Sequence, residues 1–182
     1  MGAATHVALI RGINVGGRNP VPMATLRERL TAHGVDEVRT YIQSGNVLVH
    51  APGRSEAQVT TLVEDCLVED FDVTTVVVTV SAATLRKAVE DAPAGFGTRP
   101  DDFHSDVAFL RPGVDSADAL AAFGIREGVD TAWAGDGVVY FQRLSAQRTR
   151  SRMSTVMASP FYQDMTIRNW RTTTTLVGMI DA

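Results

Sequence analysis

The amino-acid sequence predicts an α+β fold built from a βαββαβ unit that occurs twice. Runs with strand-like and helix-like spacing follow one another in this order along residues 1–80. The segment His6–Arg11 is echoed one hundred residues later by Asp106–Arg111, which indicates an internal repeat. Residues 93–100 are rich in Pro and Gly and fit a connection between the two copies. We therefore expect two small, packed subdomains with antiparallel sheets.

The first unit is predicted from apolar periodicity and from turn residues. Its expected elements are, in order, a strand at His6–Arg11, a helix at Pro22–His33, strands at Val38–Gln43 and Asn46–His50, a helix that follows Ser55, and a strand at Thr74–Val80. Ser44 and Gly45 are typical of a tight turn between the two middle strands. Ser55 and Gln58 have the spacing of a capping box, which marks the start of the second helix.

The second unit is predicted to repeat this order of elements. They are a strand at Asp106–Arg111, a helix at Ser116–Phe123, strands at Val129–Ala134 and Val138–Gln142, a helix near Ser145–Ala158 and a strand at Met165–Trp170. A further helix is expected after each unit, at Ala82–Ala92 and at Thr173–Ile180. The predicted subdomains are residues 1–80 and 103–182, and residues 81–102 join them.

The composition of the 182-residue chain is that of a folded globular protein, with 45% apolar and 21% charged residues. Cys66 is the only cysteine, so no disulfide framework can form. Residues 1–12 lack a secretory pattern, and no apolar run approaches the roughly 20 residues that cross a bilayer. We therefore expect a cytoplasmic protein without a membrane partner. The net charge of −4 argues against a protein that coats duplex DNA, but residues 143–171, with six Arg and one Asp, fit a local basic site.

Two polar segments that contain glycine are expected to meet at one edge of the first sheet. The segment Arg11–Asn19 follows the first strand, and its glycines allow backbone N–H groups to converge on an anion. In a sheet of order 4-1-3-2 a helical crossover makes the first two strands parallel, so the turn Gln43–Asn46 lies at the same edge. The structural alternative is that the glycines permit a sharp loop, while Asn14 and Asn19 bond to local backbone.

A third motif, Arg168–Arg171, follows an arginine-rich stretch near the end of the sequence. Its Trp and Arg side chains are suited to stack on a base while guanidinium groups hold phosphate. Trp170 fits a core position equally well. The preceding arginines at positions 148, 150 and 152 cannot share one helical face and are expected to be solvated.

Residue spacing predicts neither a metal site nor an activated nucleophile. No two histidines fall on one element at metal-ligand spacing; they are His6, His33, His50 and His104. Cys66 lies on the apolar stripe of a predicted helix and is expected to be a core residue. Ser44 has no base close to it in the sequence. We expect no metal and no cofactor.

Three segments of the chain carry a resemblance to a known family: Leu9–Gly17 (LIRGINVGG), Tyr41–Asn46 (YIQSGN) and Thr166–Trp170 (TIRNW). In this order they resemble the signatures of a bacterial family, the domain of unknown function 1697. The resemblance spans essentially the whole chain and implies a two-subdomain α+β fold with ferredoxin-like halves. It implies no established activity.

The leading hypothesis is a protein that binds a phosphate-bearing or other anionic small molecule, such as a nucleotide, at the predicted sheet edge. The expected ligand-binding residues are Arg11, Gly12, Asn14, Gly16, Gly17, Asn19, Gln43, Ser44, Asn46, Arg168 and Asn169. One alternative is an enzyme that stabilises an oxyanion with Arg, Asn, Gln and Ser side chains, so catalysis stays open. A structural scaffold and a binder of single-stranded nucleic acid are further alternatives. The latter is favoured less, because residues 1–80 contain only two aromatic side chains.

Overall fold

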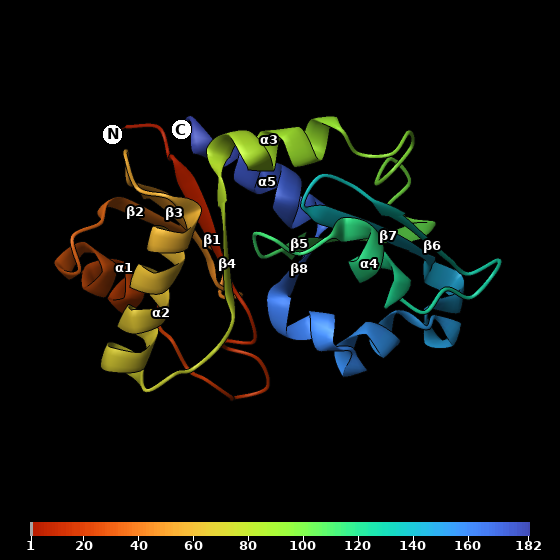
Figure 1. The fold of residues 1–182 in the computed structure, drawn as a ribbon, viewed down its shortest axis with the longest axis horizontal. Coiled ribbons are helices and arrows are strands. Elements are labelled where there is room, and N and C mark those ends of the chain that lie inside the picture. Colours follow the sequence, from red (N-terminus) through yellow and green to blue (C-terminus); the bar gives the residue numbers. More distant parts are fainter. Residues whose placement is uncertain (1) are drawn as a thin grey trace. The chain divides into compact units, whose positions relative to one another are not determined.

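The computed structural model describes residues 2–182 and contains two four-stranded antiparallel sheets (Figure 1). The predicted α+β fold class is confirmed. Contacts divide the chain into two compact units: the described residues up to Arg86 together with Leu176–Ala182, and Lys87–Thr175. This division falls inside two helices, α3 (Ala82–Glu90) and α5 (Trp170–Ile180). Among residues 2–182, no helix combines the length and the apolar character required to cross a membrane.

The first unit has the predicted order of elements. They are β1 (His6–Ile10), α1 (Met23–Ala32), β2 (Asp36–Tyr41), β3 (Asn46–His50), α2 (Glu56–Phe71) and β4 (Val77–Ser81). The strand order β2-β3-β1-β4 is the predicted one, with every neighbouring pair antiparallel. The capping box at the start of α2 is also confirmed: the Gln58 N–H donates to Ser55 Oγ at 3.2 Å, and the Ser55 N–H donates to Gln58 Oε1 at 2.8 Å.

The core of the first unit lies between its sheet and its two helices. Both α1 and α2 cover one face of the sheet (Figure 1), and their buried side chains form one apolar cluster with β1, β3 and β4. Leu26 and Leu30 of α1 and Val63 and Leu67 of α2 are completely buried. Each such side chain stabilises the fold by about 1.5–3 kcal/mol. The two helices are therefore held side by side.

The last residues of the chain are bonded into the first unit. The Ala4 N–H donates to the carbonyl of Ile180 at 2.8 Å, and the guanidinium of Arg39 donates to the carbonyl of Ala182 at 2.6 Å. Arg86 forms an ion pair with Asp181 at 2.7 Å. These bonds explain why the end of α5 groups with the first unit in space although it follows the second unit in sequence.

The second unit repeats the topology of the first. It contains β5 (Phe103–Leu110), α4 (Ser116–Ala121), β6 (Asp130–Ala134), β7 (Val138–Leu144) and β8 (Met165–Asn169), in the strand order β6-β7-β5-β8. Even single hydrogen bonds recur at equivalent positions. The Ile10 N–H donates to the carbonyl of Gly45 at 2.8 Å, and the Leu110 N–H donates to that of Gly137 at 3.0 Å. The structure thus agrees with a duplicated ferredoxin-like unit.

The predicted helix near Ser145–Ala158 is wrong. Three short 3₁₀ helices occupy the connection between β7 and β8, namely η1 (Ser145–Arg150), η2 (Met153–Ala158) and η3 (Pro160–Asp164). The buried residues of η2 are Met153 and Val156, whose spacing of three suits a 3₁₀ turn. Pro160 lacks an N–H group and starts a new turn rather than extending the preceding one. The arginines at 148, 150 and 152 are exposed, as expected.

Candidate functional site

The two polar segments of the first unit meet at one edge of its sheet, as predicted. The loop after β1 approaches the turn between β2 and β3, where the side-chain Nδ2 of Asn14 donates to the carbonyl of Gln43 at 2.9 Å. The Ile10 N–H donates to the carbonyl of Gly45 in the same turn at 2.8 Å. The contact follows from the strand order, because β1 and β2 are parallel and end at the same edge.

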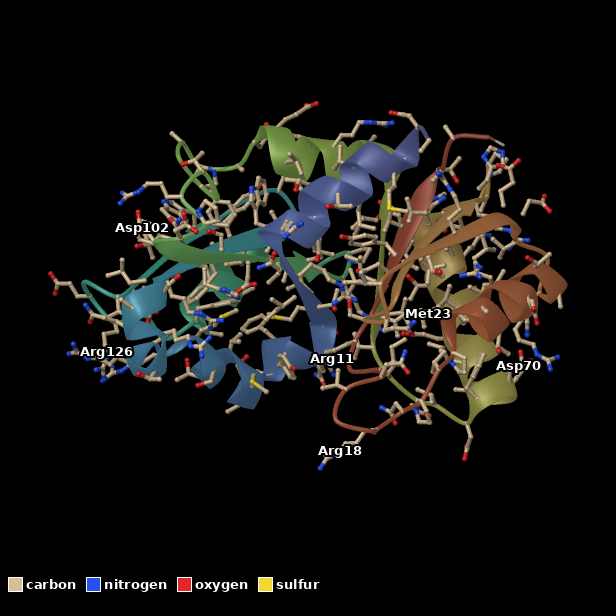
Figure 2. The ribbon with its side chains drawn as sticks, turned by 180° about the vertical axis from the view of Figure 1, so that it is seen from behind. Arg11, Arg18, Met23, Asp70, Asp102 and Arg126 are labelled. Carbon is tan, nitrogen blue, oxygen red and sulfur yellow. The ribbon has the colours of Figure 1, made fainter. Side chains whose placement is uncertain are left out.

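The paired glycines of this loop form the turn of a small hairpin. Gly16 and Gly17 have φ values of +58° and +74°, and the Arg18 N–H donates to the carbonyl of Val15 at 3.0 Å. Positive φ at both central residues is the requirement of a type I′ two-residue hairpin turn, which glycine meets without strain. Figure 2 shows Arg18 on a loop that projects from the sheet. The turn therefore gives these glycines a structural role.

The asparagines of the first two motifs bind backbone groups of the same edge. Asn14 Nδ2 donates to the carbonyl of Val21 at 2.8 Å as well as to that of Gln43, and Asn14 Oδ1 accepts the Val21 N–H at 2.8 Å. Asn19 and Asn46 each donate to a backbone carbonyl, at 3.2 Å and 3.1 Å. These bonds confirm the local role expected of Asn14 and Asn19. Ligand binding by the asparagines stays a prediction.

Only some of the predicted ligand-binding side chains at this edge are exposed to solvent. Arg18, Gln43 and Ser44 are exposed, whereas Arg11 is half-buried. The backbone of Arg11 is fixed on both sides, because its N–H donates to the Val76 carbonyl at 2.9 Å and its carbonyl accepts the Thr75 hydroxyl at 2.6 Å. Of the two arginines in the loop after β1, Arg18 is the more exposed.

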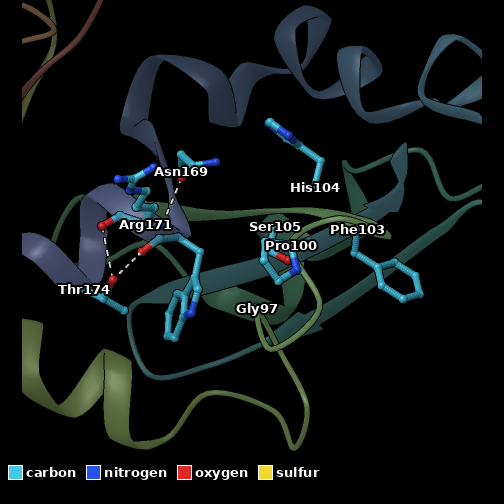
Figure 3. Close-up of a pocket in the computed structure, with 9 residues that line it drawn as sticks. Gly97, Pro100, Phe103, His104, Ser105, Asn169, Arg171 and Thr174 are labelled. Carbon is cyan, nitrogen blue, oxygen red and sulfur yellow. Dashed lines mark hydrogen bonds between the residues drawn. The ribbon is translucent and has the colours of Figure 1, made fainter. Parts of the chain in front are cut away.

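The second unit contains a cavity of about 500 Å³ (Figure 3). Its walls come from the loop at residues 97–100, the start of β5 and the first turns of α5. Of the predicted ligand-binding residues, Asn169 lines this cavity, and so do its neighbours Trp170 and Arg171. The third motif and the Pro/Gly-rich connection thus meet at one place within this unit.

Trp170 is fixed in the cavity wall by other aromatic rings. Phe96 lies at the centre of the group, with its ring centroid 5.0 Å from Trp170, 5.4 Å from Tyr140 and 6.0 Å from Trp133. All three pairs are edge-to-face, the favoured arrangement for aromatic rings. Gly97 completes the packing, because a Cβ at this position would lie only 2.0 Å from Cδ1 of Trp170. The indole therefore has a defined position at the cavity.

The start of α5 brings polar groups to the same cavity. Asn169 precedes the helix, and its Oδ1 accepts the Arg171 N–H at 2.9 Å, which Figure 3 shows as a dashed line. This N-cap explains why α5 begins at Trp170 rather than at the predicted Thr173. The N-terminal end of a helix carries a positive partial charge, and the exposed Arg171 adds a full one.

Arg168 occupies a different environment from Asn169. It is buried, with 8% of its surface exposed, and its Nη1 donates to the Thr166 hydroxyl at 2.8 Å and to the Ile167 carbonyl at 2.9 Å. Burial lowers the pKa of Arg168 to about 10, because a charged guanidinium is less stable away from water. The side chain still carries its charge at neutral pH. Ligand binding by Arg168 stays a prediction.

The wall formed by β5 contributes an imidazole and a hydroxyl. His104 and Ser105 line the cavity, and Ser105 Oγ accepts a bond from Gln142 Nε2 at 3.3 Å. Behind them, Asp106 Oδ1 lies 3.7 Å from His104 Nε2, and Arg143 lies 3.7 Å from the other carboxylate oxygen. Burial raises the pKa of Asp106, while the positive charges of His104 and Arg143 oppose this shift.

The cavity is suited to anions with an aromatic or apolar part. Among the nine described residues that line it there is no Asp or Glu, while Arg171 supplies positive charge and Trp170 and Phe103 supply rings. Sequence reasoning missed the contributions of Phe103 and His104. The composition of the Pro/Gly-rich segment predicts only a connection, and nothing in its local pattern indicates that it folds back on α5.

Comparisons with known proteins agree with this fold. The structure is similar to that of the conserved bacterial protein SP0830 from Streptococcus pneumoniae, with a TM-score of 0.78 over 99% of this chain and 100% of that chain. The sequences are 24% identical, so this likeness shows the fold alone. No curated protein is similar enough in sequence to match. The model of the family described as "Protein of unknown function (DUF1697)" matches residues 3–140, which include the first two motifs, and the chain therefore belongs to this family.

Proposed function

We propose that the protein binds a small anionic ligand with a planar ring, such as a mononucleotide, in the cavity of the second unit. The observation that carries the proposal is the combination of Trp170 and Arg171 in the wall of one cavity whose described lining has no carboxylate. The ligand class is the one that the sequence predicts. The location differs, because the sequence prediction centred on the edge of the first sheet.

The size and chemistry of the cavity suit a ligand of this kind. A volume of about 500 Å³ lies within the usual range for small-molecule sites, roughly 300–1,000 Å³. Stacking of a base on an aromatic side chain contributes about 1–3 kcal/mol, and Trp170 is already fixed by Phe96. A phosphate group would be bound by Arg171 at the positive end of α5. The ring and the charge of the ligand thus have separate partners.

The edge of the first sheet offers fewer groups for a ligand. The amide groups of Asn14 and Asn46 are bound to backbone carbonyls, so a ligand would have to replace existing bonds. Breaking a hydrogen bond without an equivalent replacement lowers affinity. The exposed Arg18 is the accessible cation at this edge and provides a direct comparison with Arg171.

The test is calorimetric titration of the full chain with AMP, adenosine and inorganic phosphate. AMP is expected to bind more tightly than either of the others, because only AMP has both a ring and a charge. The Arg171→Ala variant should weaken AMP binding by about 10- to 150-fold, which corresponds to a lost charged hydrogen bond of about 1.5–3 kcal/mol. The matched variant Arg18→Ala should bind AMP as the wild type does.

Other outcomes of this titration distinguish the alternative functions. If none of the three compounds binds at millimolar concentration, the proposal is wrong. Loss of binding in Arg18→Ala but not in Arg171→Ala would identify the edge of the first sheet as the site. An oligonucleotide that binds far more tightly than AMP, with affinity that falls steeply with salt, would indicate a binder of single-stranded nucleic acid. Conversion of the ligand during the titration would indicate an enzyme.

A further inference from the structure

A second group of chemically active side chains lies in the first unit, where α1 and α2 pack side by side. His33 is the residue at the C-terminal end of α1, and Cys66 and Asp70 are one turn apart on α2. Their ligand atoms all lie within 4.8 Å of one another. Cys66 is buried in the core and His33 is half-buried, so the group reaches from the core to solvent. Asp70 lies toward the surface (Figure 2).

The carboxylate of Asp70 is oriented toward both other side chains. Its Oδ2 lies 3.0 Å from His33 Nε2 and accepts a bond from Cys66 Sγ at 3.7 Å. Its other oxygen, Oδ1, lies 3.4 Å from Nε of Arg29. Arg29 therefore holds one oxygen and leaves the other directed at the imidazole and the thiol. An outer group that fixes a carboxylate in this way is a common feature of metal sites.

We propose that His33, Cys66 and Asp70 bind one divalent transition-metal ion and that Zn²⁺ is the ion they fit best. Bond lengths of 2.0–2.3 Å place two ligands of a tetrahedral zinc about 3.3–3.8 Å apart. The observed separations of 3.0 Å and 3.7 Å are close to these values. The imidazole and the thiol, which lie within 4.8 Å of each other, must approach by about 1–1.5 Å at most. His33 is partly exposed and can make this movement.

The donor set favours zinc, cobalt or nickel over magnesium or calcium. A sulfur, a nitrogen and an oxygen form a mixed set, whereas magnesium and calcium prefer oxygen ligands alone. Three protein ligands leave a fourth position for water or for the exposed carboxylate of Glu69, whose Oε2 lies 3.8 Å from His33 Nε2. The two negative charges of the thiolate and of Asp70 balance the two positive charges of the ion.

Metal binding at this site must displace the proton of the Cys66 thiol. Burial and the negative charge of Asp70 raise the pKa of the Cys66 thiol to about 12, so the thiol is protonated at neutral pH. When the ion binds, the S–H bond breaks, a bond between sulfur and the metal forms, and the proton passes to solvent. No oxidation or reduction takes place.

Histidine spacing alone did not reveal this group. His33 and Cys66 lie on different helices, and only the packing of α1 against α2 brings them together. The signal present in the sequence is the spacing of Cys66 and Asp70, four residues apart, which places both on one face of a helix. The expectation that the chain binds no metal concerns the four histidines and Cys66, which lie on separate elements, and it leaves Asp70 out.

The experiment is a titration of the metal-stripped full chain with Co²⁺, followed by absorbance. Tetrahedral cobalt bound to a thiolate gives a charge-transfer band in the near ultraviolet and strong visible bands. One Co²⁺ per chain with both signals is expected, and Zn²⁺ should displace it. Absence of the charge-transfer band at saturating Co²⁺ overturns the proposal, because the buried thiol is then no ligand.

Two histidine variants locate the ion. His33→Gln should weaken Co²⁺ binding by about ten-fold or more. The matched control is His50→Gln, which removes another histidine of the same unit, bonded to the carbonyl of Ala3, and should leave binding unchanged. Cys66→Ala should abolish the charge-transfer band. If Cys66→Ala does not fold, the charge-transfer band of the wild type and the Co²⁺ affinity of His33→Gln test the proposal instead. Binding by His33→Gln that equals the wild type contradicts the proposal.

Discussion

Replacement of Gly97 by Ala is expected to destabilise the second unit and to displace Trp170 from the cavity wall. An added Cβ would lie 2.0 Å from Cδ1, 2.2 Å from Nε1 and 2.8 Å from Cγ of the indole. Carbon atoms in favourable contact are about 3.5–4.0 Å apart. Either the ring or the loop must therefore move by more than about 1 Å, and the ring is held in place by Phe96.

The size of the effect follows from two contributions. Gly97 has a φ of +70°, a left-handed conformation that is unfavourable for Ala by about 1–2 kcal/mol. Overpacking against Trp170 adds about 1–3 kcal/mol. Gly95→Ala is the matched control, since Gly95 has a φ of +79° and no described atom would lie within 4 Å of its Cβ. The free energy of unfolding should fall by about 1–2 kcal/mol in Gly95→Ala and by about 2–5 kcal/mol in Gly97→Ala.

Tryptophan fluorescence during urea unfolding measures both effects. The sequence has two tryptophans, Trp133 and Trp170, and both lie in the second unit in contact with Phe96. The emission therefore reports on this unit. Gly97→Ala should change the emission of the folded protein and lower the unfolding midpoint, whereas Gly95→Ala should keep the native emission. Equal losses of stability with native emission in both variants would refute the reasoning.

Three further predictions concern stability. Asn14→Ala removes three hydrogen bonds of the first loop and places Ala at a φ of +55°, so the free energy of unfolding should fall by about 2–4 kcal/mol in urea unfolding followed by circular dichroism. Arg18→Ala should lower it by less than about 0.5 kcal/mol, and similar values for the two variants would contradict the structural role of Asn14. Ser55→Ala removes the capping bond of α2 and should lose about 1 kcal/mol in the same assay, and an unchanged midpoint would show that the cap is dispensable. Burial raises the pKa of Asp106 in the folded protein above 3.8, so ionisation of this carboxyl opposes folding as pH rises. When pH is lowered from 7 to 4, the wild type should therefore gain stability relative to Asp106→Asn, and a change of opposite sign would mean that the positive neighbours of Asp106 outweigh burial.

The elements that could be predicted from the sequence are those set by local chemistry. Ser55 and Gln58 predict a helix start because a capping box involves residues only three apart. The turn at Ser44 and Gly45 and the crossover through α1 together predict the strand order of the first sheet. The meeting of the first two motifs follows from that order. In each case the decisive interaction lies within a few residues or follows from a general rule of topology.

The features that could not be predicted depend on contacts between distant residues. The connection near Ser145–Ala158 has helix-compatible residues, but packing buries Met153 and Val156 in a 3₁₀ turn. The cavity exists because Gly97 and Trp170, which are far apart in sequence, approach closely. The approach of His33 to Cys66 likewise needs the packing of two helices. Local periodicity carries no information on the approach of Gly97 to Trp170 or of His33 to Cys66.

The central claim, a cavity in the second unit that binds a planar anion, is tested most directly through the two indole N–H resonances of the protein. NMR titration of the ¹⁵N-labelled chain with AMP should shift the Trp170 resonance to saturation, with Trp133→Phe used for assignment. The shift should require about ten-fold or more AMP in Arg171→Ala, as expected for a lost charged hydrogen bond, and should be unchanged in Arg18→Ala. An indole spectrum that does not respond to millimolar AMP, or a response lost in Arg18→Ala alone, would contradict the claim.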